Sequence, residues 1–131
     1  MAVTAFYQEQ LDRIDSILQK DLNNVDIHFV LLIDMSGHII ARWDNGSKGF
    51  DAYALAALAA GSFAAVKAMA TIVGETDFPM LFHKGKKENI HFSLVGDKFL
   101  LITIFGNNMT LGLLRLIVSE AVNKIKKALT A

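Results

Sequence analysis

Four histidines are the side chains of this chain best suited to proton transfer or metal binding, and their spacing favours neither. They are His28, His38, His83 and His91. A helical zinc site needs two histidines four residues apart on one face, whereas these lie in separate segments with the apolar pattern of strands. His28 and His91 are candidates for neighbours on adjacent strands, where a packed pair is favoured over a metal site. We therefore expect no metal site.

Motifs for nucleophilic catalysis and for phosphate binding are also missing. The sequence has no Gly-x-Ser-x-Gly, no Gly-x-x-x-x-Gly-Lys-Ser/Thr and no Gly-x-Gly-x-x-Gly. The segment Gly106 to Arg115 precedes an expected helix, as a phosphate loop would, but it has no cation at its start, so a capped turn is the better interpretation. The chain has no cysteine, which excludes thiolate chemistry. We expect no cofactor, no catalytic residues and no enzymatic activity of the chain itself.

Composition predicts one packed domain over residues 1–131. The chain is 53% hydrophobic and 20% charged, with 13 basic and 13 acidic residues and a formal net charge of zero. This balance lacks the basic stripe that nucleic-acid binding requires, so no nucleic-acid partner is predicted. Residues 1–12 lack the basic and apolar regions of a secretory signal, and we expect a cytoplasmic protein.

Hydrophobic periodicity and turn residues divide the chain into eight elements. Apolar side chains at helical spacing predict three helices, and β-branched or aromatic runs bounded by turn residues predict five strands. The expected helices span residues 3–21, 52–73 and 110–128, and the expected strands span 27–35, 38–43, 80–84, 90–95 and 99–105. Four polar or glycine residues should fix the boundaries: Asp34 in the first hairpin turn, Asp51 and Thr110 as helix N-caps, and Gly74 as a helix terminator.

The order α-β-β-α-β-β-β-α, with short connections, predicts an α+β fold with a single five-stranded antiparallel sheet and helices on both faces. The strands 27–35 and 99–105 are apolar on both alternating faces, so the sheet must be covered on both sides. We expect the first and last helices on one face and the middle helix on the other. The short strand 80–84 is charged at its end, which suits a sheet edge.

The middle helix is the most unusual segment, because 22 residues from Ala52 to Val73 carry ten alanines and one charge, Lys67. A helix that is apolar on all sides must be covered on all sides. Alanine contributes little to membrane insertion and Lys67 lies near the centre, so no membrane insertion is predicted. Two open alternatives are a helix buried wholly in its own fold and a helix that meets a second protein, which we favour because 131 residues are few to wrap it.

Helical spacing sorts the side chains of this helix into two groups. We expect the bulky group to face the core of the chain and the small group to face a partner. The bulky group is Leu55, Leu58, Val66, Met69 and Val73, and the small group is Ala57, Ala60, Gly61, Ala64 and Ala68.

Several sequence strings resemble a known family. The stretches Leu31 to Ala41, Leu58 to Ala65 and Gly112 to Arg115 are similar to the roadblock/dynein light chain family. The strings Gly74-Glu75, Phe78-Pro79, Phe82-His83 and Leu111-Gly112-Leu113 with Arg115 more narrowly resemble its bacterial gliding-motility branch, whose members partner a small Ras-like GTPase. The resemblance covers nearly the whole chain and implies a roadblock/profilin-like fold.

The resemblance further implies a homodimer in which edge strands pair into a ten-stranded sheet and the two long helices lie side by side to dock the GTPase. Expected partner-binding residues are Tyr53, Ala57, Ala60, Ala64, Lys67, Ala68 and Thr71. Expected dimer-interface residues are Ala54, Gly61, Ala65, Leu81, Phe82 and His83.

The chain departs from that branch in two places. Gly106 and Asn108 stand where the branch has an acidic residue and an arginine in the turn before the last helix. A polar tail that follows the last helix in the branch has no counterpart in this sequence, so no function of such a tail is expected.

The leading hypothesis is a homodimer that binds a Ras-like GTPase in its GTP form and stimulates hydrolysis by reorganising the GTPase's own catalytic residues. A trans-acting arginine is the other route to stimulation. Arg13 and Arg115 lie in helices assigned to the opposite sheet face, which leaves Arg42. Two alternatives stay open: a scaffold or adaptor that only positions a GTPase or a motor or polarity protein, and an enzyme or small-molecule sensor with a pocket in the sheet.

Overall fold

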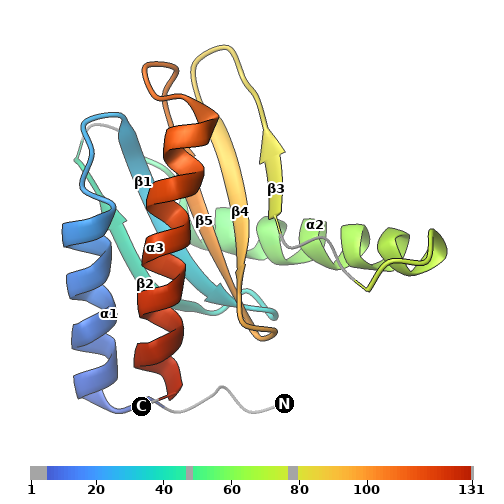
Figure 1. Cartoon of the computed structure of the whole chain (residues 1–131), viewed down its shortest axis with the longest axis horizontal. Coiled ribbons are helices and arrows are strands. Elements are labelled where there is room, and N and C mark those ends of the chain that lie inside the picture. Colours follow the sequence, from blue (N-terminus) through green and yellow to red (C-terminus); the bar gives the residue numbers. More distant parts are fainter. Residues whose placement is uncertain (1–5, 47–48, 77–79, 131) are drawn as a thin grey trace.

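The computed structural model describes residues 6–46, 49–76 and 80–130, and these form one antiparallel sheet with helices on both faces. The strands lie in the order β2-β1-β5-β4-β3. α1 and α3 run side by side over one face, and α2 crosses the other (Figure 1). This confirms the predicted fold class, element order and helix placement. The elements are α1 (Gln8–Asp21), β1 (Ile27–Asp34), β2 (Ile39–Asp44), α2 (Ala52–Ile72), β3 (Met80–His83), β4 (Asn89–Val95), β5 (Phe99–Phe105) and α3 (Leu111–Thr130).

Element boundaries differ from the predicted ones by a few residues. The first helix begins at Gln8 rather than residue 3, because Tyr7 is its N-cap and the Gln10 side chain accepts the backbone N–H of Tyr7 at 3.0 Å. The last helix continues to Thr130. Residues 3–5, expected in the first helix, and Phe78 and Pro79, which contribute to the family resemblance, lie outside the described residues.

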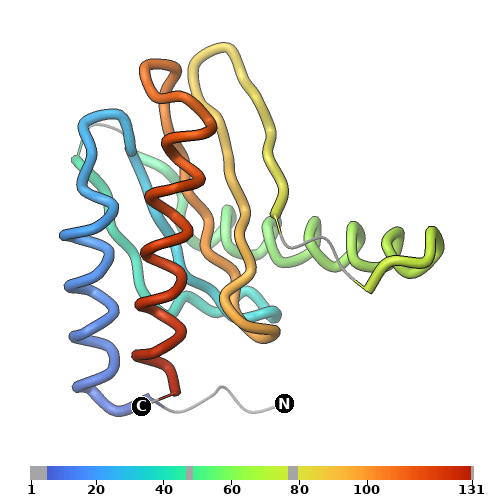
Figure 2. Tube along the Cα trace, in the orientation of Figure 1, coloured from blue at the N-terminus to red at the C-terminus, as the bar shows by residue number. Residues whose placement is uncertain are grey.

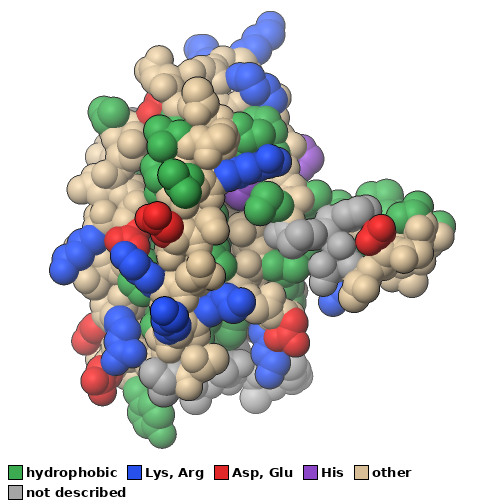
Figure 3. Space-filling model, in the orientation of Figure 1, with side chains coloured by type: hydrophobic (Ala, Val, Ile, Leu, Met, Phe, Trp, Pro, Cys, Tyr) green, Lys and Arg blue, Asp and Glu red, His purple; other side chains and the backbone are tan. Residues whose placement is uncertain are grey.

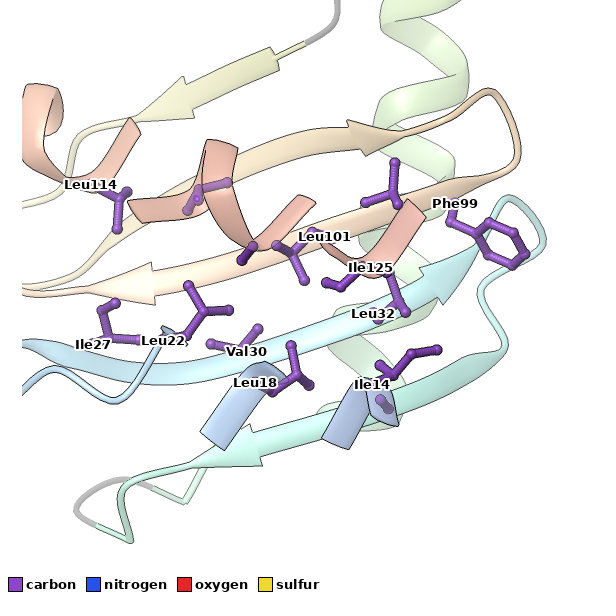
Figure 4. Close-up of a cluster of buried hydrophobic side chains, with 14 of the residues drawn as sticks. Ile14, Leu18, Leu22, Ile27, Val30, Leu32, Phe99, Leu101, Leu114 and Ile125 are labelled. Atoms are coloured by element: carbon purple, nitrogen blue, oxygen red, sulfur yellow. The ribbon is translucent and has the colours of Figure 1, made fainter. Parts of the chain in front are cut away.

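The strands β1 and β5 form the centre of the sheet and are buried on both faces, as predicted. On one face their side chains meet those of α1 and α3 in the larger hydrophobic core (Figure 4). The strands contribute Ile27, Val30, Leu32, Phe99 and Leu101, and the helices contribute Ile14, Leu18, Leu114, Val118 and Ile125.

The opposite face carries a second core beneath α2. Its strand residues are bulky, and its helix residues are mostly small. The strands supply Phe29, Leu31, Ile33, Leu100, Ile102 and Ile104, and α2 supplies Ala52, Ala56, Ala59, Ala60 and Phe63.

The predicted helix caps are confirmed. The Asp51 carboxylate accepts the backbone N–H of Ala54 at 3.1 Å at the start of α2, and the Thr110 hydroxyl accepts that of Leu113 at 3.1 Å at the start of α3. Gly74 has a φ of 85° just after α2, and the N–H of Glu75 bonds back to the carbonyl of Ala70 at 2.8 Å. These bonds satisfy backbone groups that a helix end leaves without partners.

Asp26 holds the turn before α3. The Asp26 carboxylate accepts the N–H of Asn108 at 2.8 Å, and its backbone carbonyl accepts the N–H of Gly106 at 2.9 Å. A Cβ atom on Gly106 would overlap the Asp26 carboxylate. The glycine is therefore required for this close approach.

We predict that Gly106→Ala destabilises the fold by about 1–3 kcal/mol, because the added methyl group displaces Asp26 and leaves the N–H of Asn108 without its acceptor. The matched control is Gly112→Ala in α3, where an added Cβ meets nothing within 4 Å. This control should be neutral or stabilising by up to about 1 kcal/mol, since alanine is the better helix former. Urea unfolding of both variants measures the difference, and equal free energies of unfolding would contradict the assigned role of Gly106.

Candidate protein-interaction surface

The inner face of α2 is built mainly from small side chains, which contradicts the prediction that the bulky group faces the core. Ala52, Ala56, Ala59 and Phe63 face the sheet and are buried. Of the bulky group expected in the core, Leu58, Met69 and Val73 are exposed, and Leu55 and Val66 are only partly covered. The prediction that the bulky face lines the core is therefore wrong.

The physical reason is that large side chains of the strands already fill the space between the sheet and α2. The strand residues beneath α2 include Phe29, Leu31 and Ile102, which fill the space between the layers. Small helix side chains let the backbone of α2 approach this surface closely, and close packing then leaves no void. Large residues on the inner face would hold the helix away from the sheet.

The turn between β1 and β2 also fixes the position of α2. Gly37 has a φ of 90°, and a Cβ on it would lie 3.3 Å from the Cα of Ala57, so the turn lies directly against the helix backbone. The Asp34 carboxylate holds this turn, as predicted, by accepting the N–H groups of Ser36 and His38 at 3.0 and 2.9 Å. Burial acts to raise the pKa of Asp34, but its hydrogen bonds with His38 and Ser36 outweigh burial and lower the pKa.

The C-terminal half of α2 projects past β3, beyond the edge of its own sheet (Figures 1 and 2). Large apolar side chains are exposed along the helix and just after it: Leu58 is 73% exposed, Ile72 is 83% exposed, and Met69 and Val73 are more than half exposed. Exposed apolar groups at this density on one helix are typical of an interaction site.

A continuous outward stripe runs along α2 opposite the sheet. It contains Ala54, Leu58, Gly61, Ala65 and Ile72, which recur at steps of three, four and seven and are all exposed. Small residues fill the middle of the stripe, and a large apolar residue stands toward each end. Such a surface admits the backbone of another helix at short distance.

The expected partner-binding residues lie along a stripe beside the outward one, with one exception. Tyr53, Ala57, Ala64, Lys67, Ala68 and Thr71 are exposed. Ala60 is only 8% exposed and belongs to the core beneath α2, because it lies on the side of the helix that meets the sheet. Ala60 is therefore covered by its own chain and is not available to a partner.

The strand β3 is an edge of the sheet, as predicted, and pairs with β4 through Met80 to His83. Of the expected dimer residues on it, Leu81 and Phe82 are half-buried and His83 is exposed. The Phe82 ring stacks on Phe105 with 5.9 Å between ring centroids, toward α3. The other backbone edge of β3 has no strand partner among the described residues.

The three arginines divide between the two faces as expected. Arg13 lies in α1, where it pairs with Glu9 at 3.8 Å, and Arg115 lies in α3. Arg42 lies on the α2 side, with its guanidinium carbon 5.4 Å from the centroid of the Phe29 ring. It also approaches Asp44 at 3.8 Å, so its side chain already has partners within the chain.

The histidines are dispersed. His28 and His91 are not neighbours, contrary to the expectation, because β5 lies between β1 and β4. His28 instead approaches Glu88 at 2.7 Å and Asp26 at 3.5 Å. The described ranges contain no group of three or more His, Cys, Asp or Glu side chains placed to hold a metal ion.

Sequence reasoning missed the exposure of Leu58, Met69 and Ile72. Both groups recur at helical spacing, so spacing alone does not show which of them faces the sheet. The signal that marks the inner face is the recurrence of Ala52, Ala56, Ala59 and Phe63 at steps of three and four.

Comparisons with known proteins agree with this geometry. The Roadblock/LC7 domain model matches residues 14–105. MglB from Myxococcus xanthus is 32% identical, with a TM-score of 0.85, and the alignment covers 97% of this chain and 95% of that one. The gliding protein MglB from Thermus thermophilus is 25% identical, with a TM-score of 0.89, over 98% of this chain and 96% of that one. A comparison with curated proteins gave no match.

Two further solved structures also match this chain. One described as MglB with a tetrameric arrangement has a TM-score of 0.90 at 25% identity, over 98% of this chain and 96% of that one. Profilin IA from Acanthamoeba castellanii has a TM-score of 0.60 at 9% identity, over 86% of this chain and 96% of that one, and shares the fold alone. Together these matches confirm the roadblock resemblance and the roadblock/profilin-like fold.

By length and composition α2 is also apolar enough to cross a membrane, and it is the one such helix in the described part of the chain. Core helices of other folds meet the same criterion. Here the buried residues Ala52, Ala56, Ala59 and Phe63 attach α2 to the sheet.

We predict that Phe63→Ala destabilises the chain by about 3–5 kcal/mol at every protein concentration, because it opens a cavity under α2. The matched variant is Leu58→Ala on the outward stripe. Leu58 is 73% exposed, so its loss should leave the monomer nearly unchanged, and any effect through association should depend on protein concentration and vanish on dilution. Denaturant unfolding at several protein concentrations compares the two. A concentration-independent loss of similar size for Leu58→Ala would contradict the observed orientation of α2.

Proposed function

Because the chain belongs to the Roadblock/LC7 family, we propose that it is a homodimeric regulator of a small Ras-like GTPase. In this proposal the dimer binds the GTP form and stimulates hydrolysis by reorganising the catalytic residues of the GTPase. The observation that carries the proposal is the outer surface of α2, which is apolar, exposed and free of catalytic groups over its described length. The similarity to MglB over nearly the full chain supports the choice of partner class.

The homodimer accounts for the projection of α2 past β3. If two β3 strands pair edge to edge, the sheets join into ten strands, and each projecting helix half comes to lie over the partner's side of the joint sheet. The two helices then run side by side on one face of that sheet, and in this proposal they meet along the flank of the outward stripe that carries Leu58 and Ala65. A stable dimer buries about 1,600 Å² in total. The relative described as tetrameric is consistent with a self-associating fold.

The neighbouring stripe remains available to the GTPase in such a dimer. Ala57, Ala64 and Ala68 present methyl groups there, with Tyr53 and Lys67 beside them. A separate apolar groove of about 280 Å³ lies on the other flank of α2 and is lined by Phe50, Asp51, Leu55, Leu58, Glu88, Ile90 and Ile104. A stripe made mainly of methyl groups recognises the shape of a partner rather than its charge.

Stimulation follows from selective binding in this scheme. A partner that binds one conformation of the GTPase more tightly shifts the population toward that conformation. The dimer would favour the arrangement in which the GTPase's own arginine and glutamine are placed for hydrolysis. The proposal places the protein in the cytoplasm, with α2 engaged by protein rather than by a membrane, and in a gliding-motility or cell-polarity role.

Ala65→Arg is predicted to break the dimer, weakening self-association by about 100-fold, because it buries an unpaired cation between the two helices. Sedimentation should then show the monomer mass at micromolar protein with an unchanged circular dichroism spectrum. Gln19→Arg on the exposed face of α1 is the control and should sediment like the wild type. A wild-type mass for Ala65→Arg would rule out pairing through the outward stripe.

The double variant Ala64→Arg with Ala68→Arg is predicted to abolish stimulation of GTP hydrolysis while leaving the fold intact, since two large cations hold the GTPase away from the helix. Turnover by the GTPase encoded nearest to this protein is measured with and without each variant. Arg42→Ala should change stimulation little, because its guanidinium is engaged by Phe29 and Asp44.

The outcomes separate the alternatives. Normal stimulation by the double variant would rule out this interface. A loss of stimulation of several hundred-fold with Arg42→Ala, at unchanged binding, would indicate that Arg42 is inserted into the active site of the GTPase. Binding by the wild-type protein without any stimulation would instead make it a scaffold that positions the GTPase or a motor or polarity protein.

A further inference from the structure

A cavity of about 180 Å³ lies between α3 and the β3–β4 edge, on the sheet face opposite α2. Met80 from β3, His91 and Ser93 from β4, and Arg115, Ser119 and Asn123 from α3 line it. Figure 3 shows cationic and histidine side chains side by side between α3 and β3. No part of the proposed α2 surface contributes to this cavity.

Two rows of polar side chains, one on α3 and one on β4, line the cavity. Arg115, Ser119 and Asn123 follow one another at steps of four, so they form one line along α3. His91 and Ser93 are two residues apart on β4 and share one face of that strand. Elsewhere the contact between α3 and the sheet is apolar (Figure 4). Arg115, Ser119 and Asn123 are exposed, whereas His91 and Ser93 are buried, so the cavity joins solvent-facing polar groups of α3 to buried polar groups of β4.

His91 lacks the partners that a buried polar group usually has. It is 1% exposed, and neither ring nitrogen has a hydrogen-bond partner among the described residues. The hydroxyl of Thr103, opposite His91 on β5, is equally buried and without such a partner. Buried polar groups without partners are costly and uncommon in native proteins. Burial, and then the charge of Arg115, lowers the pKa of His91 to about 4, so the ring is neutral at pH 7.

The charge in the cavity selects an anion. Among the described residues that line it, Arg115 is the only charged group and His91 the only other titratable one. Within the described ranges Arg115 forms no ion pair, and a guanidinium binds a carboxylate through two parallel hydrogen bonds. The remaining lining is apolar, from Met80, Leu94, Val118 and Val122. One cation with an apolar wall suits a monoanion with a short carbon chain better than a phosphate dianion.

We propose that this cavity binds a carboxylate group, with Arg115 as its counter-ion and the side chains of Ser119 and Asn123 as further hydrogen-bond donors. The volume is below the 300–1,000 Å³ of typical ligand pockets, so the cavity suits a small group rather than a large ligand. The carboxylate can come from a free small acid or from an acidic side chain of a docked protein. The inference does not rest on the proposed GTPase function, because the cavity and α2 lie on opposite faces of the sheet.

The test is a titration followed by amide and histidine NMR signals, with sodium chloride as the ionic-strength control. Sodium butyrate represents the free acid, and N-acetyl-glutamate-N-methylamide represents the side chain. We expect saturable shifts at His91, Ser93 and Ser119, and a raised pKa of His91, because a bound anion stabilises the protonated ring. The probe that binds more tightly identifies the source of the carboxylate.

Arg115→Gln should weaken binding by about tenfold or more, and Arg115→Lys should weaken it less, since lysine keeps the charge but loses the fork of donors. Arg13→Gln, an exposed arginine on α1, is the matched control and should bind like the wild type. The proposal is overturned if neither probe saturates, which would leave water as the only occupant, or if Arg115→Gln and Arg13→Gln bind equally.

Discussion

The structure depends on burying the central strands β1 and β5 from both sides. Residues such as Val30 and Leu32 point to one face, and Phe29, Leu31 and Ile33 point to the other, and all are buried. Two helices cover the first face along their length, whereas the second has the single helix α2, which crosses it and leaves it (Figure 1). The second face is therefore closed less completely than the first. The groove beside Leu55 and Ile90 is one result of that difference.

The composition of α2 follows from the same constraint. A helix that covers a sheet alone must approach it closely, and the alanines at 52, 56 and 59 permit this. Because the space beneath is already filled by strand side chains, the larger helix residues Leu58, Met69 and Ile72 turn outward. Their exposure is thus a consequence of how the sheet is covered. Exposed apolar side chains gathered on one helix mark a surface suited to a partner, which is the physical argument for the proposed dimer.

Much of the fold could be predicted because its signals are local. Asp51, Gly74 and Thr110 mark helix ends, and the doubly apolar strands 27–34 and 99–105 require layers on both sides. The orientation of α2 could not be predicted from spacing, since Ala56 and Phe63 recur as regularly as Leu58 and Ala65. The outcome depends on the bulk of the strands beneath, which is a tertiary property. The isolation of His91 was likewise hidden, because it depends on the β4–β5 register that places His91 opposite Thr103.

The position of Arg42 bears on how the proposed regulator could accelerate hydrolysis by its partner. To reach a bound nucleotide its guanidinium would have to leave the Phe29 ring and Asp44, and each contact opposes that movement. Selective binding needs no such movement, but it needs discrimination: inverting a 1:99 equilibrium requires about 10⁴-fold tighter binding to the favoured state. In the proposed complex, a helix lined by Ala57, Ala64 and Ala68 would supply discrimination through distance, because close backbone approach would fit one arrangement of the partner's loops and clash with another. The small side chains of α2 would then be the origin of both affinity and selectivity.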